Sequence, residues 1–390
     1  MLRRGHKKSR VGCVQCKKRH VKCDERRPKC ILCSMSNRDC SYASDSIQSI
    51  TDSEPASSSS TISTSTPPPS YPSPRPTQAI EQCINLQHIE LITHLISDSR
   101  MLSLGDGVEP YHIGIARALR RGLESPFLLY ELLALSARHL SHLHQESSPS
   151  QAEQYARQAM DLQTQGIALF NAEKVIVDQN NCVAVCLFSV VLGHHLLTDT
   201  LCHREGGLNG FLERYVQCLE THRGVFTVSM TGWDLLMETE LGPALSRSRQ
   251  FTSSEPKGTE CDQLKALVFG SENLSLIEKS SCLSAIGHLQ RGFDAVFQPE
   301  DNNMRYQMVF LWTMLVPPEF TSMLAAKRPE ALIMLAYYAV LLHHGRDIWQ
   351  VGEAGRYIFG LIEEYLSPGL GWDAWLEHPR VALASLDDKN

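Results

Sequence analysis

Six cysteines near the amino terminus follow one spacing twice, and this pattern limits what the segment can fold into more than any other feature. The unit C-x2-C-x6-C occurs twice, with six residues between the copies. The six positions are Cys13, Cys16, Cys23, Cys30, Cys33 and Cys40. A segment of this length with few large apolar side chains cannot bury a stabilising core. Bonds between thiolates and zinc can hold it instead, at about 10–16 kcal/mol per structural site.

Six thiolates cannot complete two separate four-coordinate zinc sites, but they can serve two metals if two sulfurs bridge both ions. A single zinc-ribbon site is an alternative, although it leaves two thiols spare and the repeat unexplained. A redox C-x-x-C motif is another, although it would need a βαβ context that the sequence lacks. A zinc ion surrounded by sulfur has no open position for water, so we expect a structural metal.

The spacing and the basic residues around it resemble the fungal zinc binuclear cluster family of DNA-binding proteins. The resemblance implies two zinc ions, with Cys13 and Cys30 as the sulfurs that bridge them. It assigns the remaining ligands as Cys16 with Cys23 at one zinc and Cys33 with Cys40 at the other. Pro28 lies between the two halves, where the family also places a proline.

A basic stretch between Cys16 and Cys23 is the predicted DNA contact. Its members are Lys17, Lys18, Arg19, His20 and Lys22. Cations neutralise phosphates, whereas contacts with base edges specify sequence. In the family this stretch is a short helix, and a Lys or Arg four residues after the second cysteine reads a CGG-type triplet. His20 holds that position here, and a neutral imidazole cannot make the same guanine contact, so Arg19 is an alternative reader. A merely solvated basic face is the other interpretation.

Charge is distributed unevenly over the chain, although the formal net charge is −6. Residues 1–40 carry 13 Lys and Arg against 3 Asp and Glu, whereas residues 78–390 carry 23 against 37. A basic head on an acidic body indicates a module that binds polyanions, joined to something else. The basic leader, residues 1–12, suits a nuclear-import signal or an arm that lies along phosphates.

Residues 41–77 form the predicted linker, in which 25 of 37 residues are Ser, Thr or Pro. Such a composition cannot offset its ordering entropy by burial, so we expect disorder. The sequence shows no heptad repeat after the cysteines, which favours DNA binding as a monomer or dimerisation through the body. The oligomeric state stays open.

Residues 78–390 show helical periodicity and few strand signals, which predicts an all-α body of about ten helices. Ile80, Ile84, Leu91, Ile92, Leu95 and Ile96 recur at helical spacing. Ser125-Pro126 begins a helix that runs to His144. Another begins at Pro329 and ends at Gly345, and its stretch Ala331–Leu342 is apolar on nearly every face, so we expect it at the centre of the core.

Three segments of the body, 125–137, 210–212 and 328–343, resemble the regulatory domain of fungal sterol uptake control proteins. The resemblance implies a helical domain that senses a sterol in an apolar pocket and controls activation. Its ligand-binding residues are unknown at this point. Cys182 and Cys186 share a helix face without a second pair nearby, so we interpret them as core thiols.

The fold expected is therefore a small two-zinc, six-cysteine cluster domain at 13–40 and a large all-α regulatory domain, joined by a disordered linker. The function expected is a nuclear, sequence-specific regulator of RNA polymerase II genes that binds double-stranded DNA and the transcription machinery. One hypothesis adds a sterol or other lipid ligand that holds the protein in the cytoplasm. The alternative is a pathway-specific regulator of a secondary-metabolite gene cluster without a sterol ligand.

An enzyme fused to a DNA tether is the third hypothesis, and the sequence disfavours it because no catalytic constellation occurs. The first eight residues carry no apolar stretch, so they do not form a secretory signal, and the 13 cysteines of a reducing compartment are not expected in disulfides. The longest apolar run has 12 residues, too short to span a bilayer.

Overall fold

A computed structural model gives the fold of the chain as two compact units, Met1–Pro74 and Arg75–Asn390. The structure describes residues 12–19, 21, 23–27, 29–36, 39–42, 85–102, 111–172, 176–297, 304–367 and 371–387. The predicted leader, apart from residue 12, and the predicted linker beyond residue 42 lie outside the described residues.

Two five-residue helices make up the regular structure described in the first unit, α1 (Val14–Lys18) and α2 (Ile31–Met35). Each begins directly after a cysteine of the repeat, Cys13 for α1 and Cys30 for α2. Helices this short are not stable alone in water. We therefore expect the zinc–thiolate bonds predicted from the sequence to hold both helices in place.

Helices are the regular secondary structure of the second unit among its described residues, which confirms the predicted all-α class. Its helices are α4 (Leu86–Ser97), α5 (Tyr111–Glu124), α6 (Pro126–His144), α7 (Pro149–Ala172), α8 (Cys182–Cys202), α9 (Gly207–Met230), α10 (Trp233–Met237), α11 (Gly242–Ser253), α12 (Asp262–Gly270), α13 (Leu276–Phe297), α14 (Gln307–Leu315), α15 (Pro318–Ala325), α16 (Pro329–His344), α17 (Ala354–Leu366) and α18 (Asp373–Asp387). Fifteen helices among the described residues exceed the ten expected, because helices of five to nine residues are too short to show a period.

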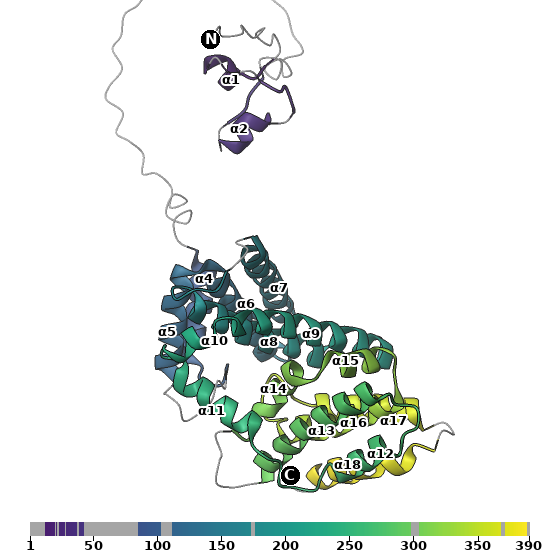
Figure 1. Cartoon of the computed structure of the whole chain (residues 1–390). Helices are drawn as coiled ribbons and strands as arrows, with labels where there is room; N and C mark the ends of the chain where they lie inside the picture. The colour runs from purple at the N-terminus through teal and green to yellow at the C-terminus, as the bar shows by residue number, and fades with distance from the viewer. Residues whose placement is uncertain are drawn as a thin grey trace, which may run out of the picture. The chain divides into compact units, whose positions relative to one another are not determined.

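One hydrophobic core surrounds α16, as its all-round apolar sequence predicts. Every residue from Glu330 to His343 is buried, and the helix begins at Pro329 and is capped by Gly345, as expected. Helices α12, α13, α14, α15, α17 and α18 pack around it, and Figure 1 shows them gathered in the green and yellow part of the unit. The position of α16 therefore follows from its lack of a polar face.

A second core lies between α5, α6 and α8, where Phe170 stacks on Phe188 and Phe127 meets both rings edge to face. Helix α6 spans the residues predicted for it, although the Ser125 side chain makes no cap hydrogen bond. Helix α9 contacts α8 on one side and α14 and α15 on the other, so it joins the two cores (Figure 1).

The apolar stripe expected before residue 97 is only partly buried. Leu91 and Leu95 of α4 are fully buried, but Ile96 is half exposed, while Ile80 and Ile84 lie outside the described residues. Because α4 packs mainly on α6, one narrow face is covered and Ile96 lies beside it.

Helix α8 is long and apolar enough to cross a bilayer, with 21 residues and a mean hydropathy of 1.7 in its most apolar window. However, 78% of that window is buried inside the second unit, as in the core helix of a globular domain. Helices α14 and α15 pass the same test only as a pair, and they bend by 91° between them.

Candidate zinc centre and nucleic-acid interface

The repeat in the sequence places equivalent cysteines at equivalent points of α1 and α2. Cys13 is the N-cap of α1 and Cys30 the N-cap of α2, while Cys16 and Cys33 lie inside the first turns. The Cys16 backbone N–H donates to Cys13 Sγ over 3.4 Å. Each helix start therefore presents two sulfurs in the same direction.

The six sulfur atoms fall into two overlapping groups of four. The first group contains Cys13, Cys16, Cys23 and Cys30, and the second contains Cys13, Cys30, Cys33 and Cys40. Within each group the Sγ atoms all lie within 4.8 Å of one another. Cys13 and Cys30 belong to both groups. The set thus has the composition that two four-coordinate metals with two shared ligands require.

The spacing of the sulfurs fits zinc. Two sulfurs bound to one tetrahedral zinc at about 2.3 Å lie about 3.8 Å apart. The Sγ atom of Cys13 lies 3.7 Å from those of Cys30 and Cys33. Burial raises the pKa of the Cys13, Cys30 and Cys33 thiols, so thiolates at these positions need a nearby cation.

Backbone N–H groups support the outer sulfurs. Cys23 Sγ accepts from the backbone N–H of Cys13 and of Glu25, each over 3.4 Å. Cys40 Sγ accepts from the Cys30 backbone N–H over 3.3 Å. Donors of this kind fix metal ligands in place and stabilise their negative charge.

Residues after the last cysteine close the domain, and the sequence analysis did not identify this role. Ser41 O accepts from Val14 N–H over 2.8 Å, and Gln15 Oε1 accepts from Ser41 N–H over 3.0 Å. The buried Tyr42 donates its hydroxyl to Arg26 O over 2.8 Å, and Arg27 lies over its ring. A lone tyrosine two residues past Cys40 was the available signal.

Three of the five predicted DNA-contact residues are described. Lys17 and Lys18 are exposed at the end of α1, where basic side chains also suit the helix dipole. Arg19 is half-buried, and its Nη2 lies 3.9 Å from Cys16 Sγ. His20 and Lys22 lie outside the described residues, as does Pro28. The two exposed lysines thus form the described part of the basic surface.

Comparison with known proteins identifies this unit. Residues 11–49 match the fungal Zn(2)-Cys(6) binuclear cluster domain. The first unit of the chain therefore carries this zinc cluster domain. This domain binds two zinc ions, which confirms the cofactor predicted from the cysteine spacing, and it implies DNA binding.

Three relatives show how far the similarity extends. A Zn(2)-C6 fungal-type transcription factor of Gibberella zeae is 21% identical over 439 aligned residues, which cover 99% of this chain and 87% of the relative. Sterol uptake control protein 2 of Candida albicans is 50% identical over 48 residues, 12% of this chain and 7% of that protein. White-opaque regulator 2 of Candida albicans is 47% identical over 34 residues, 9% of this chain and 8% of that protein. The two short matches align too few residues of this chain to cover its helical body.

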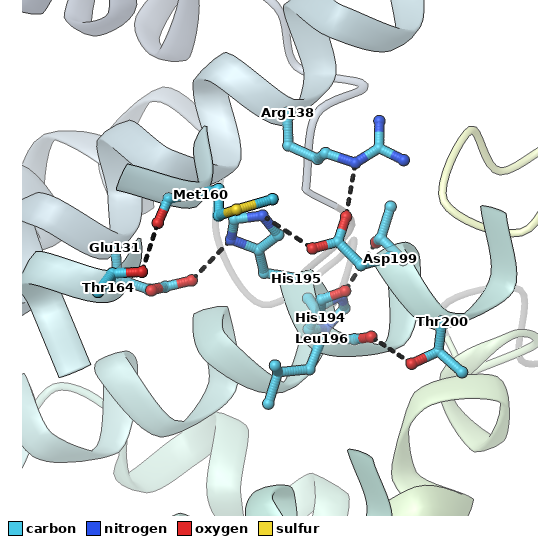
Figure 2. Close-up of polar contacts among 10 residues, drawn as sticks. Glu131, Arg138, Met160, Thr164, His194, His195, Leu196, Asp199 and Thr200 are labelled. Carbon is cyan, nitrogen blue, oxygen red and sulfur yellow. Dashed lines mark hydrogen bonds and ion pairs between the residues drawn. The ribbon is translucent and has the colours of Figure 1, made fainter. Parts of the chain in front are cut away.

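The body contains an ionic chain that the sequence analysis missed, buried at Glu131 and His195 and exposed at Asp199 (Figure 2). Glu131 of α6 lies 2.9 Å from His195 Nδ1, and His195 Nε2 lies 3.6 Å from Asp199. Asp199 accepts from Arg138 Nε over 2.7 Å. Burial lowers the pKa of His195, but Asp199 and Glu131 outweigh it, so the net shift is upward. A glutamate within the apolar stretch of α6 was the signal available in the sequence.

A cavity of about 610 Å³ lies beside this chain, between α6, α7, α8 and α9. Arg138, His195, Asp199 and Arg214 contribute polar groups to its wall. Ala156, Ala159, Met160 and Leu196 line the apolar part. A ligand here would need both an apolar face and hydrogen-bonding groups.

Proposed function

We propose that this chain is a sequence-specific DNA-binding regulator of RNA polymerase II genes that acts in the nucleus by binding rather than by catalysis. In this proposal Cys13 and Cys30 bridge two zinc ions. Cys16 and Cys23 complete the ligand set of one ion, and Cys33 and Cys40 complete that of the other. The observation that carries the proposal is the overlap of the two sulfur groups at Cys13 and Cys30.

In this proposal the zinc cluster holds a cationic surface in a fixed position. Zinc fixes Cys16 at the start of the basic stretch and Cys23 at its end, so Lys17 and Lys18 project from a short helix held at both sides. We propose that these lysines, with Arg19, His20 and Lys22, contact DNA. Phosphate contacts supply affinity, and Arg19 or His20 supplies the contact with base edges.

Selection from random duplexes with the zinc-loaded full-length protein tests sequence specificity. We expect one enriched motif, and we expect no enrichment after zinc is removed with a chelator. A zinc-loaded protein that binds DNA but enriches no motif would contradict sequence specificity. Lys265→Ala serves as a control variant, because this lysine is in the body and pairs with Asp262. It should enrich the same motif as the wild type.

Control by a small molecule in the body is a second candidate function, favoured by the cavity between α6, α7, α8 and α9. Its wall includes Arg138 and Asp199, whose desolvation by the fused hydrocarbon rings of a sterol would be unfavourable. This cavity therefore supports the alternative without a sterol ligand more than the sterol hypothesis. Mass spectrometry of lipids that co-purify with the full-length protein tests this: a stoichiometric sterol would restore the sterol hypothesis.

A further inference from the structure

Two imidazoles and a carboxylate converge in the second unit, where the end of α4 meets α6. His94 lies in the last turn of α4, Asp98 is the C-cap of that helix, and His139 lies in α6. His94 Nε2 lies 3.0 Å from His139 Nδ1. One ligand atom from each of the three residues lies within 4.8 Å of the other two.

The three side chains are of the types that bind divalent metal ions. Burial lowers the pKa of His94 and lowers that of His139 to about 4. A hydrogen bond from Arg100 lowers the pKa of Asp98 to about 2. Neutral imidazole and carboxylate are the forms in which these side chains bind zinc.

Neighbouring side chains fix the orientation of these groups. Arg100 donates from its backbone N–H and Nε to Asp98 Oδ1 and from Nη2 to Oδ2, over 2.9–3.1 Å. The Trp349 ring lies 4.6 Å from the His139 ring, and its Nε1–H donates to Met101 O over 3.0 Å. Contacts of this kind commonly orient metal ligands. A carboxylate has about four acceptor sites, so Asp98 retains capacity for a metal ion.

A hydrogen bond between two histidines is the simpler explanation of the 3.0 Å contact. It does not explain why the Asp98 carboxylate, which Arg100 holds, also lies within reach of both rings. Two nitrogens bound to one tetrahedral zinc at about 2.0–2.1 Å lie about 3.3 Å apart, so a small adjustment of the rings would admit the ion.

We propose that His94, Asp98 and His139 bind a divalent metal ion of the zinc type, which joins α4 to α6. Three protein ligands leave a fourth position for water. This ion therefore exchanges more readily than the zinc ions enclosed by sulfur. Its occupancy makes the attachment of α4, the first described helix of the second unit, depend on the concentration of free zinc.

The zinc content of the full-length protein at buffered free zinc tests the proposal. We expect three ions per chain in the wild type, two in the amino-terminal cluster and one in the body, and two ions per chain in the His94→Gln and Asp98→Asn variants. Both residues are half-buried, so these substitutions perturb the core less than a change at His139. The matched control is His142→Gln, because His142 also stacks near Trp349 but lies outside the group, and it should keep three ions.

Tryptophan fluorescence tests in a second way where the third ion binds. Cobalt bound at the site lies next to Trp349 and should quench its emission, and the Trp349→Phe variant, which keeps the other four tryptophans of the chain, should lose this quenching. A wild-type content of two ions overturns the proposal. So does a third ion that persists in both His94→Gln and Asp98→Asn, or one that leaves Trp349 emission unchanged, because either result places the ion elsewhere.

Discussion

Cys13 Sγ lies 3.7 Å from Cys30 Sγ, and these two atoms are the members common to both groups of four sulfurs. The relationship follows from the repeat, because each residue is the N-cap of a five-residue helix. Each cap cysteine brings one further sulfur with it, from Cys16 or Cys33. In the proposed arrangement these two sulfurs bridge both zinc ions, so the two metal sites depend on each other.

Replacing a shared sulfur should therefore empty both sites. In full-length Cys13→Ala protein we expect loss of both zinc ions from the cluster and loss of DNA binding, while the body keeps its melting temperature. Metal–thiolate charge-transfer absorption after cobalt substitution measures the cluster separately from any other site. A gel-shift assay measures DNA binding.

Two further variants serve as comparisons for the metal content of the Cys13→Ala protein. Cys40→Ala removes a ligand from one group only, so we expect it to retain one ion. Cys202→Ala changes an exposed cysteine of the body and should retain both. Full metal loading of Cys13→Ala would show that Cys13 is not a bridging ligand.

The exposed lysines at the end of α1 should contribute to binding through phosphate neutralisation. For Lys17→Ala and for Lys18→Ala we expect the slope of log K against log salt to decrease by about 0.9 each, with a similar loss on every duplex. A salt titration of the binding constant measures this slope. Lys265→Ala should leave it unchanged, and an unchanged slope in both α1 variants would remove these lysines from the interface.

The residue at position 20 should affect which sequence is preferred. In the family that the cluster resembles, a Lys or Arg at this position reads guanine, so His20→Lys should shift preference toward CGG-type sites by about 1–3 kcal/mol. Competition between duplexes with and without a CGG triplet measures the shift. An unchanged preference would show that another residue, such as Arg19, contacts the bases.

The zinc cluster could be predicted from the sequence because its signal is local. The spacing of the cysteines alone gives the number of sulfur ligands and their positions along the chain. It did not predict how the domain closes. The bonds between Gln15 and Ser41 and between Tyr42 and Arg26 join residues far apart in the chain. No periodicity or composition encodes such a pairing.

In the body, helices with strong end signals were predictable. Pro126 and Pro329 begin the helices expected of them, and the uniformly apolar α16 lies at the core. The ionic chain around His195 was not predictable, since Glu131 meets His195 only when α6 packs on α8. The cavity beside it depends on four helices and has no sequence signature.

Replacing the Glu131 carboxylate by a neutral amide should destabilise the body, because Glu131 is fully buried beside His195. Breaking a buried pair by removing one charge typically costs about 3–5 kcal/mol. We therefore expect Glu131→Gln to lower the free energy of unfolding of the body by an amount of this order, measured by chemical denaturation. The control is Asp262→Asn, which removes an exposed pair with Lys265 and should cost less than about 1 kcal/mol. Equal small losses would show that the contact between Glu131 and His195 contributes little to stability.

Two buried histidines should make the body sensitive to acid. Burial lowers the pKa of His194 to about 3 and that of His222 to about 4. His194 Nδ1 accepts from the Gln350 amide over 3.2 Å, and its ring stacks on Phe310. His222 Nδ1 lies 3.0 Å from Thr313 Oγ1. Both side chains are therefore neutral in the folded state at pH 7.

The direction of this pH effect follows from the protons that the folded and the unfolded chain bind. Below about pH 6.5 the unfolded chain binds protons at His194 and His222, while the folded body does not. The free energy of unfolding should thus fall as the pH falls from about 6.5 to about 4, by up to about 1.4 kcal/mol per pH unit for each histidine. Denaturation of the body at several pH values measures the slope, and His222→Gln should reduce it by up to about 1.4 kcal/mol per pH unit. The pKa of His195 is raised, so this histidine does not add to the loss. A free energy of unfolding that stays constant between pH 6.5 and 4 would mean that the folded body takes up these protons as readily as the unfolded chain.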